Sequence, residues 1–141
     1  MSEYLEQWLS NTSRHIKPHT AADYRYNMEK YVTPKLGRVK LEKLTPLQVQ
    51  TMLNEIADTI SPDRANKVRR ILYTALKQAL KWLLIYRNPV EATETFKHER
   101  KAMQLWSAQD TVKFLEFAQT NRLYAMFYLA ISAGLRSGEL R

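Results

Sequence analysis

Residues 61–86 read SPDRANKVRRILYTALKQALKWLLIY, and this stretch decides the fold that the sequence predicts. Ser61 followed by Pro62 is a helix start signal, because an N-cap residue precedes a proline at the first helical position. At about 100° per residue, one broad sector of the helix is apolar. Its members are Val68, Ile71, Leu72, Ala75, Leu76, Ala79, Leu80, Trp82 and Leu83. The stretch therefore predicts a long amphipathic helix, ending near Tyr86, that packs in a helical core.

A second sector of this helix is polar and basic. It holds Lys67, Arg70, Thr74, Lys77 and Lys81. No acidic residue follows Asp63 in the helix, so ion pairs within the helix cannot neutralise these cations. The stripe extends over roughly 21 Å, about the length of six base pairs of duplex DNA. Most such stripes are simply faces exposed to solvent. Here, however, the charge without ion pairs in the helix favours a face that binds nucleic acid.

The first 89 residues contain three further helical patterns. Helices are predicted to begin at Ser2, at Thr20 and at Thr45-Pro46, with Asp23 completing an acidic capping box for the second, which runs to about Val32. Only three glycines and five prolines occur, and the alternation typical of strands is absent. The fold class is therefore all-α, with a four-helix bundle over residues 1–89.

Charge is distributed unevenly along the chain. The 141 residues carry 22 Lys and Arg against 14 Asp and Glu, a net charge of +8. Residues 1–89 hold 15 of these cations and 8 of the acids, so nearly all of the excess lies there. A chain this basic most often meets a polyanion, either nucleic acid or an anionic membrane surface. The first domain is therefore the one expected to bind the polyanion.

Several classes of function are disfavoured by composition. The chain has no cysteine, which excludes disulfides, a thiol nucleophile and cysteine-bound metal, and its three histidines lack the spacing of a zinc site. No apolar run is long enough to span a membrane, and the first residues do not resemble a signal peptide. We therefore expect no metal site, no membrane partner and a cytoplasmic location.

After residue 89 the sequence changes character. Asn88-Pro89 ends the long helix, and residues 90–105 are polar and charged, as in an interdomain linker. Ser107 and Asp110 then open a helix that runs to about Gln119. The next helix, residues 123–131, is apolar almost all round, which predicts burial on more than one side. Residues 106–141 offer too few neighbours to bury it, so we expect a second domain that is truncated.

A tight corner follows the apolar helix, with the sequence AGLRSGEL at residues 133–140. Gly134 can adopt the left-handed conformation that ends a helix. Arg136 would then lie on a corner fixed by the backbone, where its guanidinium can face a phosphate, and residues 138–140 would start another helix. The bland alternative is a helix C-cap followed by an ordinary surface arginine.

Residues 133–140 resemble the first catalytic box of the tyrosine recombinases, the phage integrase family: a small residue, Gly, an apolar residue, Arg, two variable positions, Glu and Leu. The order of helices, charged linker and corner resembles the front part of such an enzyme. The resemblance implies a SAM-like core-binding domain at residues 1–89 and the N-terminal part of the catalytic domain at residues 106–141. It implies that Arg136 is the first catalytic arginine, supported by Glu139.

The family resemblance further implies DNA integration and recombination in a bacterial or phage setting. In that family two domains clamp duplex DNA, and a tyrosine forms a phosphotyrosyl link without metal or nucleotide cofactor. The complete protein would assemble as a tetramer on DNA, with this fragment monomeric. The later boxes of the family, a lysine hairpin, His-x-x-Arg and a terminal tyrosine, have no match here, so the fragment alone is not expected to cleave DNA.

The predicted contacts to double-stranded DNA combine the stripe with the second helix. They are Lys67, Arg70, Thr74, Lys77, Lys81, Lys17, Thr20 and Arg25, with Thr74 and Gln78 as candidates for reading bases. The alternative is a non-catalytic helical adaptor whose basic face meets an acidic protein. A membrane-surface helix fits poorly, because the apolar face of the long helix is needed for the core.

Overall fold

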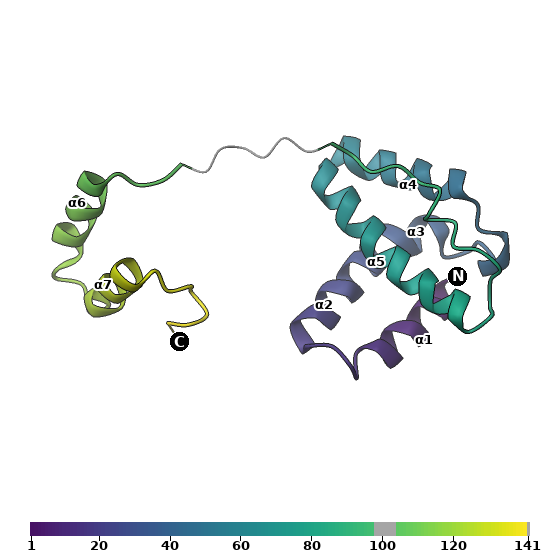
Figure 1. Cartoon of the computed structure of the whole chain (residues 1–141), viewed down its shortest axis with the longest axis horizontal. Coiled ribbons are helices and arrows are strands. Elements are labelled where there is room, and N and C mark those ends of the chain that lie inside the picture. Colours follow the sequence, from purple (N-terminus) through teal and green to yellow (C-terminus); the bar gives the residue numbers. More distant parts are fainter. Residues whose placement is uncertain (98–103, 141) are drawn as a thin grey trace. The chain divides into compact units, whose positions relative to one another are not determined.

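The computed structural model describes residues 1–97 and 104–140, in which every regular element is a helix (Figure 1). The elements are α1 (Ser2–Thr12), α2 (Pro18–Asn27), the π-helix η1 (Met28–Val32), α3 (Thr33–Leu36), the 3₁₀-helix η2 (Leu41–Lys43), α4 (Pro46–Thr59), α5 (Pro62–Lys81), α6 (Ala108–Ala118) and α7 (Tyr124–Ala133). The chain forms two compact units, Met1–Glu99 and Arg100–Arg141. The predicted all-α class is confirmed.

The core of the first unit forms around α5, which contacts α4, η1 and α1 (Figure 1). The predicted apolar sector of α5 is buried from Val68 to Ala79, and Trp8 and Leu53 of neighbouring helices are almost wholly buried as well. Each fully buried large aliphatic side chain contributes roughly 1.5–3 kcal/mol. The Tyr4 hydroxyl ties α1 to α5 by donating to the Ala75 carbonyl at 2.5 Å, and burial raises its pKa to about 12.

The second helix begins earlier and its path continues further than predicted. It starts at Pro18 with Lys17 as the N-cap, so Thr20 lies inside the helix and does not cap it. Proline presets the φ angle of the first helical position, which outweighs the weaker signal of Thr20. The helical path then passes through η1 into α3 and ends at Leu36, with Pro34 in the first turn of α3, where its missing N–H is harmless.

The long helix ends at Lys81, not near Tyr86. Leu83 adopts a left-handed conformation with φ of 58°, and the Leu84 N–H donates back to the Ala79 carbonyl at 3.0 Å. This hydrogen bond is typical of a Schellman helix end, which usually has glycine at the left-handed position. The prediction that Trp82 and Leu83 belong to the core is therefore wrong: their exposed fractions are 42% and 88%.

The first unit also extends beyond residue 89, into the segment that the sequence assigned to the linker. Residues 90–96, here called the strap, lie along α5. Val90 is fully buried, and the Arg69 guanidinium donates to the carbonyls of Val90 (3.3 Å) and Thr93 (2.9 Å). The Asn66 side chain exchanges two hydrogen bonds with the backbone of Phe96, at 2.8 and 3.0 Å. Polar side chains of α5 thus bind a segment whose composition resembles a linker.

The second unit contains α6 and α7, joined by an edge-to-face contact of Phe114 and Phe127 with ring centroids 5.5 Å apart. The predicted Ser107–Asp110 capping box is present. The predicted burial of residues 123–131 is not found, since Tyr128 and Leu129 are about half exposed. Among residues 104–140 the structure offers too few apolar partners to cover them. None of the described helices has the length and apolar character needed to cross a bilayer.

Candidate nucleic-acid interface

The basic stripe lies on α5 as predicted from Arg70 onward. Arg70, Thr74, Lys77 and Lys81 follow one another at helical spacing and are all exposed. The Thr74 hydroxyl donates to the Arg70 carbonyl at 2.9 Å, and the Lys77 ammonium lies 5.8 Å from the centre of the Tyr73 ring. Within residues 1–97 and 104–140, none of the three cations is within ion-pair distance of a carboxylate. Their charged groups are therefore accessible to phosphate groups.

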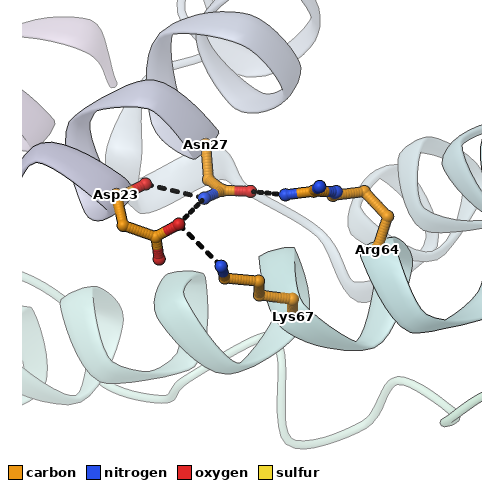
Figure 2. Close-up of polar contacts among 4 residues, drawn as sticks. All are labelled: Asp23, Asn27, Arg64 and Lys67. Carbon is orange, nitrogen blue, oxygen red and sulfur yellow. Dashed lines mark hydrogen bonds and ion pairs between the residues drawn. The ribbon is translucent and has the colours of Figure 1, made fainter. Parts of the chain in front are cut away.

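Lys67 differs from the rest of the stripe. Its ammonium lies 2.6 Å from Oδ1 of Asp23, a residue of α2 (Figure 2). The exposed fractions of the two side chains are 37% and 26%, so the pair is partly shielded from water. The prediction that the stripe is unpaired throughout is therefore wrong at Lys67, because α2 brings an acid from elsewhere in the chain.

The same pair belongs to a larger polar network between α2 and α5 (Figure 2). The amide of Asn27, fully buried, donates to the Asp23 carbonyl at 2.6 Å and to the Asp23 carboxylate at 3.3 Å. Its oxygen accepts from Arg64 at 3.3 Å, and the Arg64 guanidinium lies 6.0 Å from the centre of the Tyr31 ring. A buried amide is tolerated when its hydrogen bonds are made, and here they fix the Asp23 side chain.

Sequence reasoning missed Asn27 and Arg64 as part of this site. Asn27 lies three residues after Tyr24 and one before Met28, and both of these side chains pack in or against the core. A polar amide on a core face must find partners, and that signal points to a buried network. Arg64 carried no comparable signal, because its role depends on the packing of α2 against α5.

A shallow hollow of about 340 Å³ lies between these two helices. It is lined by Asp23, Tyr24, Lys67, Arg70, Ile71 and Thr74. The structure thus brings three predicted contacts together around one depression, with a carboxylate among them. In the described residues, no group of three or more His, Asp or Glu side chains is placed to hold a metal ion.

The three contacts predicted on the second helix lie outside this hollow. Lys17 is exposed at the helix start, and Thr20 is only half exposed. Arg25 is exposed and lies 3.5 Å from Glu29, one turn further along the helical path in η1. An exposed pair of this kind is weak and leaves the arginine available.

An aromatic cluster lies further along the same helical path, and sequence reasoning did not single it out. The Lys30 ammonium donates to the Tyr26 hydroxyl at 2.7 Å and lies over the rings of Tyr26 (5.1 Å) and Tyr31 (5.6 Å). This hydrogen bond lowers the pKa of Tyr26 and raises the pKa of Lys30. The cluster adds Lys30 to the exposed cations of the unit, and two rings hold it in place.

The corner around Arg136 has the predicted helix end. Gly134 is left-handed, with φ of 65° and ψ of 31°. The Glu139 carboxylate accepts the backbone N–H of Arg136 at 2.8 Å and lies 3.7 Å from its guanidinium, whereas residues 138–140 form no helix. The Arg136 side chain is 88% exposed. Glu139 therefore stabilises the turn, and the Arg136 guanidinium remains accessible to a ligand.

Comparisons with known proteins agree with this architecture. Residues 1–57 match the family model described as phage integrase, N-terminal SAM-like domain. The chain is 29% identical over 141 residues to the prophage integrase IntZ of Escherichia coli (strain K12), and 29% identical over 143 residues to the integrase of Enterobacteria phage 434. Each alignment covers 96% of this chain but only 35% and 40% of the relative. The chain thus spans between a third and two fifths of the length of these proteins.

Solved structures give the same result. A lambda integrase dimer bound to a COC′ core site matches with a TM-score of 0.81 at 26% identity, covering 95% of this chain and 39% of that one. An integrase-like domain from Bacillus cereus matches with a TM-score of 0.65 at 26% identity, covering 74% of this chain and 89% of that one. The chain is therefore similar to these integrases over nearly its whole length, and its residues 1–57 match the N-terminal SAM-like domain of phage integrases.

Proposed function

We propose that this chain is the DNA-binding part of a site-specific recombinase, and that its first unit binds duplex DNA mainly through phosphates. The observation that carries the proposal is the row of exposed cations Arg70, Lys77 and Lys81 on one face of α5, which forms no ion pair within the described residues. Lambda integrase, similar over 95% of this chain, is described in complex with its core site, which supports the same partner here.

Phosphate contacts position such a protein on DNA, and base edges provide sequence readout. Each phosphate that a cation neutralises releases counterions, so affinity falls as salt rises. An α-helix fits the major groove, and Thr74 lies within the row, exposed and next to the hollow. Thr74 is therefore the first candidate for a base contact, with Gln78 less accessible.

Arg136 would serve the chemical step of the complete protein. In transesterification a tyrosine oxygen attacks the scissile phosphorus and forms a phosphotyrosyl bond, the bond from phosphorus to one deoxyribose oxygen breaks and that oxygen leaves as a free hydroxyl of the DNA strand, and negative charge builds on the non-bridging phosphate oxygens. A guanidinium held in advance near these oxygens lowers the barrier. The exposed Arg136 side chain and the Glu139 contacts that hold its backbone support this role.

The expected oligomeric state and cellular location of the complete protein are inferred from the same relatives. A lambda integrase tetramer bound to a Holliday junction matches this chain with a TM-score of 0.81. We therefore place the complete protein in a tetramer on DNA, acting in the bacterial cytoplasm, with the 141-residue chain itself monomeric. The bacterial and phage origin of the curated relatives supports this setting.

The test is a titration of labelled duplex DNA of random sequence with the 141-residue chain at several salt concentrations. Replacing Arg70, Lys77 and Lys81 by alanine should weaken binding and reduce the slope of log affinity against log salt by about 2.7, or about 0.9 for each lost phosphate contact. The matched control replaces Arg38, Lys40 and Lys43, three exposed cations outside α5, by alanine.

The control removes the same net charge, so it measures the effect of charge alone. It should change the slope far less than the α5 variant. Absence of binding by the wild-type chain at low salt would contradict the proposal. Equal losses in the two triple variants would contradict the assignment of the interface to α5.

A further inference from the structure

We propose that Asp23 competes with DNA phosphate for Lys67, and thereby weakens binding to DNA of arbitrary sequence. This inference rests on the proposed function, since it concerns the same interface. It makes the Asp23–Lys67 pair a specificity-determining element, because a carboxylate at this place opposes contacts that depend on phosphate alone.

The carboxylate is held rigidly enough to act in this way. Oδ1 of Asp23 accepts from Lys67 at 2.6 Å and from the buried Asn27 amide at 3.3 Å (Figure 2). Asn27 is itself fixed by the Asp23 carbonyl at 2.6 Å and by Arg64 at 3.3 Å. Moving the Asp23 carboxylate away would therefore break its hydrogen bond from the buried Asn27 amide as well as its ion pair with Lys67.

A second acid on the same helical path, Glu29 in η1, gives the contrast. Glu29 lies 3.5 Å from Arg25, and the two side chains are 63% and 56% exposed. Water and salt screen such a pair strongly, and its side chains separate at little cost. Lys67 and Asp23 are closer and less exposed, so their attraction is screened less. Asp23 in α2 and Glu29 in η1 therefore place similar charges on one helical path with different degrees of restraint.

The position of the pair decides its effect on DNA. Asp23 and Lys67 line the hollow together with Arg70 and Thr74, so the carboxylate lies within the predicted contact surface. A phosphate that reaches Lys67 must replace Asp23 as its partner and must also approach a fixed negative charge. Arg70, exposed and unpaired in the described residues, meets a phosphate without this competition. Lys67 therefore adds little to binding until its carboxylate partner is removed or compensated.

The experiment measures binding of the 141-residue chain to a labelled duplex of random sequence by fluorescence anisotropy over a range of salt concentrations. Asp23→Asn keeps the shape of the side chain and an acceptor for Lys67 but removes the charge. It should steepen the salt slope by about 0.9, the value for one further phosphate contact, and tighten binding roughly five- to tenfold near 0.1 M salt.

The matched control is Glu29→Gln, which removes one negative charge from η1, on the same helical path as Asp23. It should change the affinity by less than about twofold, because its pair is exposed. Lys67→Ala completes a double-mutant cycle. It should change the affinity little in the wild-type background and should abolish the gain in the Asp23→Asn background.

The outcomes separate the alternatives. Equal effects of Asp23→Asn and Glu29→Gln would show that only net charge matters, and weaker binding by Asp23→Asn would show that Asp23 presents Lys67 to phosphate; either result overturns the inference. Reduced stability in urea with unchanged affinity would also overturn it, by assigning a structural role. Asp23→Ser repeats the test if Asp23→Asn does not fold. Absence of wild-type binding would instead refute the proposed function.

Discussion

At the scale of single residues, two of the helices in residues 1–97 and 104–140 end with a left-handed residue, but only one of them has glycine there. Gly134 ends α7 with φ of 65°, and the Leu135 N–H donates to the Ala130 carbonyl at 3.1 Å. Leu83 ends α5 with φ of 58° and the corresponding bond from Leu84 to Ala79. A residue with a Cβ in this conformation is strained by roughly 1–2 kcal/mol. The first unit therefore tolerates local strain at the end of its central helix.

Leu83→Gly should raise the free energy of unfolding by about 1 kcal/mol. Glycine removes the clash of Cβ with the following carbonyl, and its larger entropy in the unfolded chain offsets part of the gain. The side chain of Leu83 is 88% exposed, so its loss removes little packing. Urea unfolding followed by circular dichroism measures the change. Leu83→Ala, which keeps Cβ, is the control; an equal shift in both variants would contradict a backbone origin.

Local signals explain which residues the sequence could predict. The caps at Thr45, Ser61 and Ser107 and the helix end at Gly134 were predicted correctly, because each depends on neighbours in sequence. Leu83 was missed because leucine carries no signal for a left-handed conformation. The pairing of Lys67 was missed because its partner is 44 residues away and only folding brings the two together.

At the scale of elements, three faces of α5 have three different structural roles. One face fills the core, a second carries the basic stripe, and a third holds the strap through Asn66 and Arg69. Periodicity predicted the first two faces, because core and stripe each repeat along the helix. The third face was not predictable, because Asn66 and Arg69 bind backbone atoms of the strap. Backbone atoms are the same whatever the side chain, so the sequence of the strap does not indicate this contact.

Arg69→Ala should loosen the strap. One guanidinium donates to the Val90 carbonyl and to both the carbonyl and the hydroxyl oxygen of Thr93, and hydrogen bonds to a charged group contribute about 1.5–3 kcal/mol. Amide hydrogen exchange in residues 90–96 should therefore accelerate by at least roughly tenfold. Mass spectrometry of the exchanged peptides measures it. Arg70→Ala, the exposed neighbour, should leave these amides unchanged; acceleration in both variants would argue against a specific tether.

At the scale of the whole molecule, the two units differ in how much apolar surface they bury. The first has a continuous core that includes Trp8, Leu53 and Leu72, whereas in residues 104–140 only Ala118 is buried. The sequence predicted a division into a helical bundle and a second domain with too few partners. It placed the end of the first unit too early, because the strap has the composition of a linker while its backbone is bound to α5.

The second unit should open at a lower free energy than the first. Local stability follows the amount of buried apolar surface, and α7 leaves Tyr128, Leu129 and Ile131 substantially exposed. Native-state hydrogen exchange of the whole chain should show amides of α6 and α7 exchanging at least tenfold faster than buried amides of α5, a difference of about 1.4 kcal/mol or more. Low urea should accelerate the second unit first. Equal protection of α5 and α7 at every urea concentration would mean that both units open in one cooperative step, and that the exposed side chains of α7 find partners in solution.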